Sequence, residues 1–188
     1  KLEQIHLLLG FEGIDYHHED YYSLMIYSSL LGGGMSSRLF QEIREKRGLC
    51  YSIFSFTQMQ NSSGVFGFYA GTSPNDVDQL LEASLIEWKK IKKFISSEEL
   101  DRAKAQMKSG FIMGQESNSS RSEYFAKNMI SFRKLIETKE VIRSIENISI
   151  SSIYDLCEKL LNSAKPVLSV IGPNANSLKK LEISTILN

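Results

Sequence analysis

Residues 32–51, GGGMSSRLFQEIREKRGLCY, constrain the fold of this chain more than any other segment. Three consecutive glycines lead into an amphipathic stretch, and Gly48 then separates that stretch from an aromatic-rich one. The apolar spacing predicts a helix over residues 36–46, a left-handed stop at Gly48, and a strand after it. Arg44 on the helix and Tyr51 on the strand can therefore face one another across the turn.

Alternating patterns predict the strands. In residues 3–11, Ile5, Leu7, Leu9 and Phe11 alternate with Gln4, His6 and Leu8. The segment VLSVIG after Pro166 is also predicted to be a strand. Residues 50–59 and 65–71 flank an Asn-Ser-Ser-Gly turn, which predicts a β-hairpin.

Within the first strand of the hairpin, the side chains divide between two faces. Cys50, Ser52, Phe54 and Phe56 share one face, and Tyr51, Ile53, Ser55 and Thr57 share the other. We expect the phenylalanine face to pack under helices, which would leave Tyr51 on the more accessible face.

Helical spacing dominates the rest of the chain. A helix is predicted over residues 19–31, and a stripe with Trp88 near its end predicts another after Pro74. Ser96 and Glu99 form a capping box that opens a helix reaching about residue 115. Residues 117–122 fit a loop or a helix start, and helices are predicted over residues 124–138, over 139–146 and from 148 onward. This order predicts an α+β fold, a two-layer sandwich of a mainly antiparallel sheet with helices packed on one face.

Composition narrows the class of protein. Twenty-two basic residues balance 22 acidic ones, so nucleic acid and membrane are not expected partners. Two cysteines make no disulfide framework and fit the cytoplasm or another reducing compartment. We expect residues 1–173 to form a single domain followed by a polar tail over 174–188. We also expect Lys1 to be a cut within a longer parent chain.

No metal site is predicted within the chain. His17 and His18 lie beside Glu19 and Asp20, but adjacent side chains rarely converge on one ion, and the two acids suit a helix start. His6, on a strand, is expected to be a sheet-face histidine with a hydrogen-bond partner. Neither cysteine has a histidine nearby in the sequence to act as its base.

Two groups of residues remain candidates for chemistry. Gly32, Gly33 and Gly34 are either a flexible connector or a loop whose backbone approaches a ligand closely. Arg44 either pairs with a carboxylate such as Glu42 or Glu45, or acts together with Tyr51. From the residues alone, both alternatives stay open.

The segment GGGMSSRLFQEIREKRGLCYSIFSF closely resembles the C-terminal half of the pitrilysin and mitochondrial processing peptidase family, the inverted-motif zinc metallopeptidases. The segments FGFYAGTSP, SSEELDRAKAQMKSGF and KPVLSVIGP follow in register, so the resemblance covers about residues 3–173. It implies a parent of two similar halves, of which the N-terminal half carries His-x-x-Glu-His, a downstream Glu and the zinc. That half is absent from this chain.

The resemblance also implies roles for particular residues. Arg44 and Tyr51 match an Arg/Tyr pair that supports the transition state of peptide hydrolysis, in which a neutral tyrosine hydroxyl donates to the developing oxyanion. Gly32, Gly33, Gly34 and Met35 match a segment that binds peptide substrate. The implied partners are the N-terminal zinc-binding half or a homologous subunit, and a peptide or unfolded polypeptide substrate. The chain alone is then inactive and holds no cofactor, while the parent is a zinc metalloendopeptidase; the alternative is a non-catalytic partner or scaffold subunit of the same fold.

Overall fold

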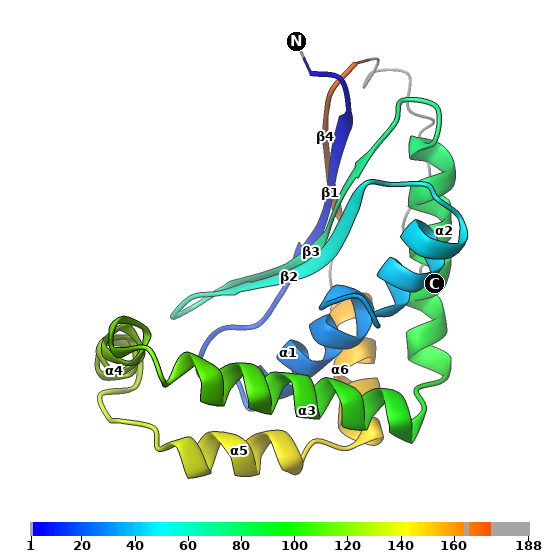
Figure 1. Ribbon diagram of the computed structural model, residues 1–188. Helices are drawn as coiled ribbons and strands as arrows, with labels where there is room; N and C mark the ends of the chain where they lie inside the picture. The colour runs from blue at the N-terminus through cyan, green and yellow to red at the C-terminus, as the bar shows by residue number, and fades with distance from the viewer. Residues whose placement is uncertain (1, 164–165, 174–188) are drawn as a thin grey trace.

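The computed structural model describes residues 2–163 and 166–173, which form a four-stranded sheet and seven helical segments (Figure 1). In chain order the elements are β1 (Ile5–Glu12), α1 (Tyr21–Gly32), η1 (Phe40–Lys46), β2 (Ser52–Met59), β3 (Gly64–Thr72), α2 (Val77–Lys93), α3 (Ser97–Gly114), α4 (Asn118–Phe132), α5 (Thr138–Glu146), α6 (Ile150–Ser163) and β4 (Val167–Ile171). The predicted tail, residues 174–188, lies outside the described residues.

The sheet has the strand order β2-β3-β1-β4, and every neighbouring pair is antiparallel. The alternation predicted for β1 is confirmed, because Ile5, Leu7, Leu9 and Phe11 are all buried. The hairpin is confirmed as β2 and β3, joined at their ends by the pairing of Met59 with Gly64. This strand order leaves β2 at one edge of the sheet.

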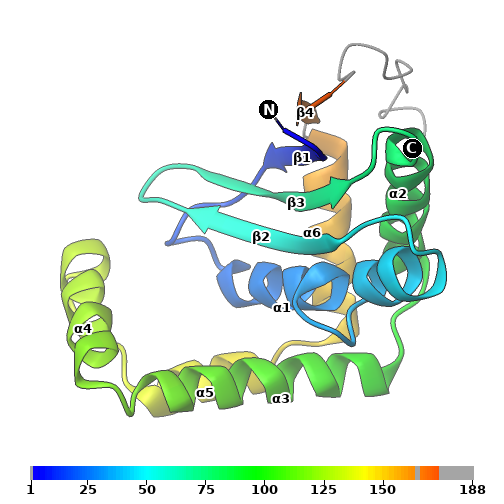
Figure 2. The same ribbon diagram turned by 45° about the horizontal axis from the view of Figure 1, so that its top comes forward.

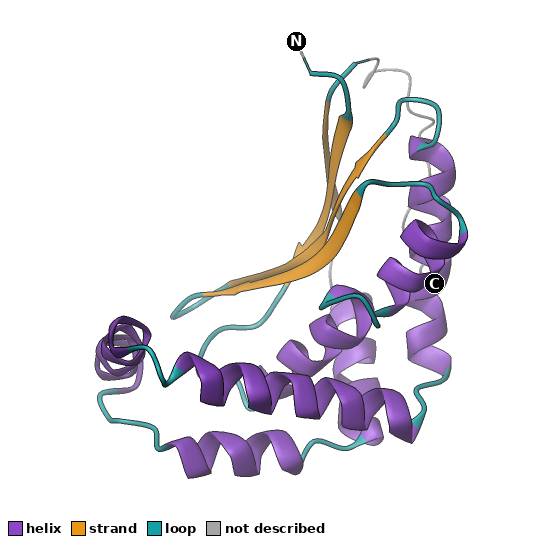
Figure 3. Ribbon diagram, in the orientation of Figure 1, coloured by secondary structure: helices purple, strands orange, loops and turns teal. Residues whose placement is uncertain are grey.

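All the helices lie on one side of the sheet, as Figures 2 and 3 show. Trp88 of α2 is 1% exposed and packs against Phe11, with ring centroids 4.6 Å apart, and against Phe66, at 5.2 Å. Tyr27 of α1 completes this aromatic centre, 5.2 Å from Phe66. Burial of such large rings supplies much of the free energy of folding, and the predicted α+β class is confirmed.

The prediction for the two faces of β2 is wrong. Phe54 is 48% exposed, whereas Ile53 is buried. Ile53 pairs with Ala70 and Ser55 with Phe68 in the hairpin register, so the Ile53 and Ser55 face meets the helices. Phe54 instead packs on Tyr69 across the outer face of the sheet, with ring centroids 5.0 Å apart. The small Ser55 lets α1 approach, and its hydroxyl donates to the carbonyl of Ser28 at 2.6 Å.

The helices differ from the predicted ones at their ends. The segment predicted over residues 36–46 becomes helical at Arg38 and takes the π form in η1, a geometry often found at functional sites. The capping box of Ser96 and Glu99 is confirmed. Residues 117–122, for which the sequence allowed a loop or a helix start, form the start of a helix that is capped by Ser117. The following helix ends at Phe132, earlier than predicted, because Arg133 is left-handed with φ 56°.

No helix of residues 2–163 or 166–173 is both long and apolar enough to cross a membrane.

Candidate functional site

An open groove lies where the end of α1, the start of η1 and the edge strand β2 meet. It has a volume of about 380 Å³. All four residues predicted to bind substrate line it together with one residue of η1 and three of β2: Gly32, Gly33, Gly34, Met35, Phe40, Ile53, Phe54 and Ser55. The glycine segment therefore forms one wall of a groove, and an edge strand forms the other.

The carbonyl groups of the glycine loop, residues 33–36, are held by side chains. Gln106 of α3 donates to the carbonyl of Gly33 at 2.8 Å, and Ser37 donates to that of Gly34 at 2.6 Å. Gln41 donates to the carbonyl of Met35, also at 2.6 Å. Three bonds to three successive carbonyls fix the loop, which argues against a flexible connector. Ser37, one of the residues that can cap the following helix, therefore closes the loop and makes no cap hydrogen bond.

The amide groups of the same loop are open. Within the described part of the chain, no partner accepts from the N–H of Gly34, Met35 or Ser36. Met35 is 75% exposed, and Ser36 is also exposed. Backbone amides without internal partners can bind the carbonyl groups of a ligand.

Gly32 has to be glycine for the groove to form. A Cβ built on it would lie 2.4 Å from the backbone nitrogen of Ser55 and 3.0 Å from the carbonyl carbon of Phe54. The absence of a side chain therefore lets the last turn of α1 touch the backbone of the edge strand.

Arg44 borders the groove through an aromatic neighbour. Its guanidinium lies 4.7 Å from the centre of the Phe40 ring, a cation–π contact, and Phe40 lines the groove. Its Nε is 3.9 Å from a carboxylate oxygen of Glu45, which is a long and half-exposed ion pair. Glu42 is held instead by Lys46 and Arg47. Much of the Arg44 charge is therefore available to a ligand.

Tyr51 stands at the entrance to β2. Its backbone N–H donates to the carbonyl of Gly71 at 2.9 Å, which fixes the main chain, while its side chain is 63% exposed. Among the described residues its hydroxyl has no hydrogen-bond partner, and its ring makes no cation–π contact with Arg44, whose guanidinium lies over Phe40 instead. The turn before it ends at Gly48, whose φ of 65° confirms the predicted left-handed stop. The two side chains are thus both exposed and both without a competing strong partner.

Cys50, between these two residues, is not poised as a nucleophile. Burial raises the pKa of its thiol to about 11, and the nearby charge of Arg44 only partly opposes this. A thiol with this pKa carries almost no thiolate at neutral pH.

The histidines have structural partners. Nδ1 of His6 is 2.7 Å from the hydroxyl of Tyr69, as expected for a sheet-face histidine. Nδ1 of His18 accepts from the backbone N–H of Asp20 at 3.0 Å, just before α1. Across residues 2–163 and 166–173, no three His, Cys, Asp or Glu side chains lie close enough to hold a metal ion.

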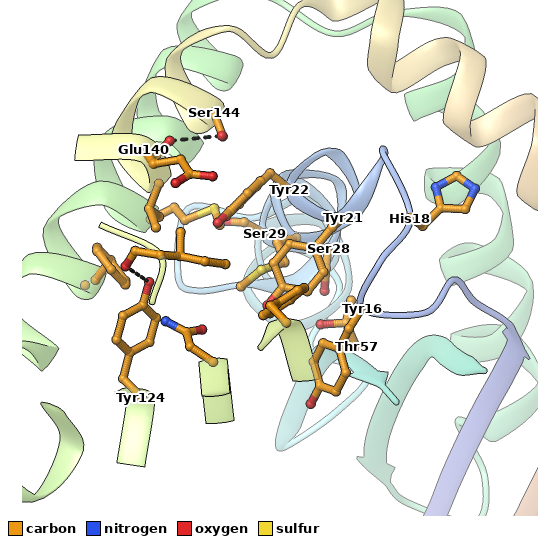
Figure 4. Close-up of a pocket in the computed structure, with 18 of the residues that line it drawn as sticks. Tyr16, His18, Tyr21, Tyr22, Ser28, Ser29, Thr57, Tyr124, Glu140 and Ser144 are labelled. Atoms are coloured by element: carbon orange, nitrogen blue, oxygen red, sulfur yellow. Dashed lines mark hydrogen bonds between the residues drawn. The ribbon is translucent and has the colours of Figure 1, made fainter. Parts of the chain in front are cut away.

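The sequence did not point to two features near the groove. Gln106 lies 73 positions from the carbonyl that it holds, so no local pattern could reveal it. A second, larger cavity of about 850 Å³ lies behind the glycine loop between α1, α3, α4 and α5, and several tyrosines face it (Figure 4). Its tyrosines come from distant segments, and only the tertiary fold gathers them.

Comparison with known proteins gives the context for this groove. Residues 1–107 match the family described as the peptidase M16 inactive domain. The chain is 39% identical to a zinc protease of Rickettsia felis over 92% of its own length, and 35% identical to the zinc protease YmxG of Bacillus subtilis over 93%. It covers 42% of the length of each of these relatives.

Solved structures have the same fold. A protease from Helicobacter pylori superposes with a TM-score of 0.83 at 26% identity, over 92% of this chain and 42% of that one. A chain of the complex III dimer of Candida albicans superposes with a TM-score of 0.87 over all of this chain and 47% of its own length; at 18% identity it shows the fold alone. The family match, the zinc-protease relatives and the fold agree with the resemblance seen in the sequence, and the chain belongs to the peptidase M16 family as its inactive, C-terminal domain.

Proposed function

We propose that this chain is the non-zinc domain of a zinc-dependent endopeptidase, and that its groove binds an extended segment of the peptide substrate. The observation that carries the proposal is a glycine loop with open amides that lines a groove whose other wall is an edge strand. An extended peptide offers alternating carbonyls and side chains to such a surface. Gly32, Gly33, Gly34 and Met35 then contact the peptide directly.

In the whole protein, the zinc is held by the other half or by a homologous subunit, and zinc supplies activation of the attacking water. Tyr51 donates its free hydroxyl to the carbonyl oxygen of the scissile bond, where negative charge develops. Arg44 binds a neighbouring carbonyl of the substrate and adds positive potential. Residues 1–173 act as one domain in this arrangement.

Phe54 provides the test of peptide binding. It lines the groove and is 48% exposed, so Phe54→Ser removes a contact with peptide at little cost in stability. Leu8→Ser is the matched control, because Leu8 is 40% exposed and does not line the groove. In the whole protein, KM for an extended fluorogenic peptide should rise by roughly tenfold for Phe54→Ser, the loss of about 1.4 kcal/mol of binding, and stay unchanged for Leu8→Ser. An equal KM for both variants would rule out the groove as the peptide site.

A non-catalytic partner subunit is the second candidate, favoured by the family's description as an inactive domain. The same peptide distinguishes the two. Cleavage by the whole protein that is abolished by a chelator supports the endopeptidase, and binding without any cleavage supports the partner subunit.

A further inference from the structure

The cavity behind the glycine loop has the size of a ligand site. Its volume of about 850 Å³ falls within the roughly 300–1,000 Å³ of pockets that hold small organic ligands. Its walls come from four helices and the end of the hairpin, and Figure 4 shows Tyr22, Tyr124 and Thr57 around it. Met25, Met107 and Phe111 contribute apolar surface.

The lining selects against charged ligands. No lysine or arginine lines this cavity in the described part of the chain, and the one histidine that lines it, His18, already lies against Asp20, so an anion would find no free counter-charge. Its two carboxylates already have partners, since Glu140 lies 3.4 Å from Lys134 and Glu19 lies 3.9 Å from Lys159. Desolvation raises the pKa of Tyr22, so this phenol stays neutral. An uncharged body that packs on aromatic rings fits these walls.

One buried polar group of the cavity wall lacks a partner. Asn128 of α4 is only 4% exposed, and its Nδ2 donates no hydrogen bond within residues 2–163 and 166–173. A buried donor without an acceptor costs about 1–3 kcal/mol. Tyr124, one turn away, has its hydroxyl occupied by the carbonyl of Ile136 at 3.0 Å. Among the described lining residues, Asn128 is therefore the buried side chain whose donor still needs an acceptor.

We propose that this cavity binds an uncharged, mainly aromatic small molecule that offers one hydrogen-bond acceptor to the amide of Asn128. The site is separate from the peptide groove. The hydrogen bond from Gln106 to Gly33 stands between the two, because both residues line the cavity and Gly33 also lines the groove.

The first test uses the neutral fluorophore 6-propionyl-2-(dimethylamino)naphthalene, which has one carbonyl acceptor. It should bind the chain saturably at one site with a blue-shifted emission, and an extended peptide should not displace it. Gly110 lines the cavity and has open space where a Cβ would stand. The side chain of Gly110→Leu would therefore occupy room that the ligand needs, and it should weaken binding by at least about tenfold.

Gly114→Leu is the matched control. Gly114 lies on the same helix, also has nothing within 4 Å of an added Cβ, and does not line the cavity. Both substitutions replace a helical glycine by a better helix former, so neither is expected to unfold the chain. Loss of binding in Gly110→Leu alone supports the site; equal affinity in the two variants, or no saturable binding at all, overturns it.

The second test concerns the acceptor and does not depend on filling the cavity. Asn128→Leu should weaken binding of the ketone fluorophore by roughly fivefold to tenfold, which corresponds to the loss of one hydrogen bond. The affinity for 2-(dimethylamino)naphthalene, which lacks the carbonyl, should not change. An equal loss for both probes would overturn the assignment of Asn128.

Discussion

Arg38 and Glu99 form a two-bond ion pair that joins the helix after the glycine loop to the capping box of α3. Nε of Arg38 is 2.9 Å from one carboxylate oxygen of Glu99, and its terminal nitrogen is 2.9 Å from the other. The same terminal nitrogen donates to the carbonyl of Phe94 at 2.7 Å. The pair therefore connects the start of the helix that follows the glycine loop to the N-terminus of the helix that carries Gln106.

Removing this pair should destabilise the fold. Arg38→Met removes the two side-chain donors of a partly buried carboxylate and leaves it only the backbone N–H of Ser96. We expect the free energy of unfolding to fall by about 2 kcal/mol. Urea titration measures the change. A double-mutant cycle with Glu99→Gln should give a coupling energy well above that of the exposed pair of Glu123 and Lys127. Equal coupling energies would contradict this prediction.

The pair should also shape the acid side of the stability curve. Hydrogen bonds from Arg38 lower the pKa of Glu99 below its ordinary value. A carboxyl with a lowered folded pKa adds stability that is fully present above its unfolded pKa, about 4.3, and is lost as the pH falls through the folded pKa. As the pH falls below about 4.5, the free energy of unfolding of Arg38→Met should therefore decrease less than that of the wild type. Parallel curves for the two proteins would contradict the assignment.

Gly32→Ala should damage the groove from within. The added Cβ would stand 2.4 Å from a backbone nitrogen of β2, which cannot move without breaking the hairpin, so we expect a loss of about 1–3 kcal/mol. Gly110→Ala is the control, a helical glycine with open space around it, and should gain about 0.5–1 kcal/mol. Thermal unfolding of both variants checks the opposite signs, and a Gly32→Ala protein as stable as the wild type would be inconsistent with the contact.

Tyr51→Phe should separate catalysis from stability. Because the hydroxyl has no partner in the described chain and the side chain is 63% exposed, stability should change by less than about 0.5 kcal/mol. In the whole protein, kcat for peptide cleavage should fall by about 100- to 1,000-fold. Tyr154→Phe should instead lower stability and leave kcat unchanged, because the Tyr154 hydroxyl accepts a hydrogen bond from the backbone N–H of Ile95 at 2.9 Å. Unchanged turnover in Tyr51→Phe would remove Tyr51 from the mechanism.

Both cysteines should resist thiol reagents while the chain is folded. Burial raises the pKa of Cys50 and of Cys157 to about 11, which lowers the thiolate fraction at pH 8 by roughly 100-fold relative to an ordinary cysteine. Reaction with Ellman's reagent should be slow in buffer and complete within minutes in concentrated urea. Fast labelling of the folded chain would show that one of the two sites opens.

Zinc analysis of the purified chain tests the division of labour in the proposed enzyme. The described residues bring no three metal-binding side chains together, so we expect less than stoichiometric zinc after dialysis and no peptide cleavage by the chain alone. One tightly held zinc per chain would contradict this expectation.

The sequence by itself determined the elements that depend on neighbouring residues. The alternation of Ile5, Leu7 and Leu9, the capping box of Ser96 and the stop at Gly48 are local patterns, and each appears in the structure as predicted. Local hydrogen bonds and side-chain periodicity fix such features before any long-range contact forms.

Only the tertiary structure decided which face of β2 is buried and what surrounds the glycine loop. Phe54 looks like a core residue in sequence, but the pairing of Ser55 with Phe68 turns it outward. The bond from Gln106 to Gly33 joins residues 73 positions apart, and the cavity walls come from four helices. Such contacts depend on strand register and helix packing, which the local pattern does not encode, because a one-residue change of register reverses every side chain of a strand.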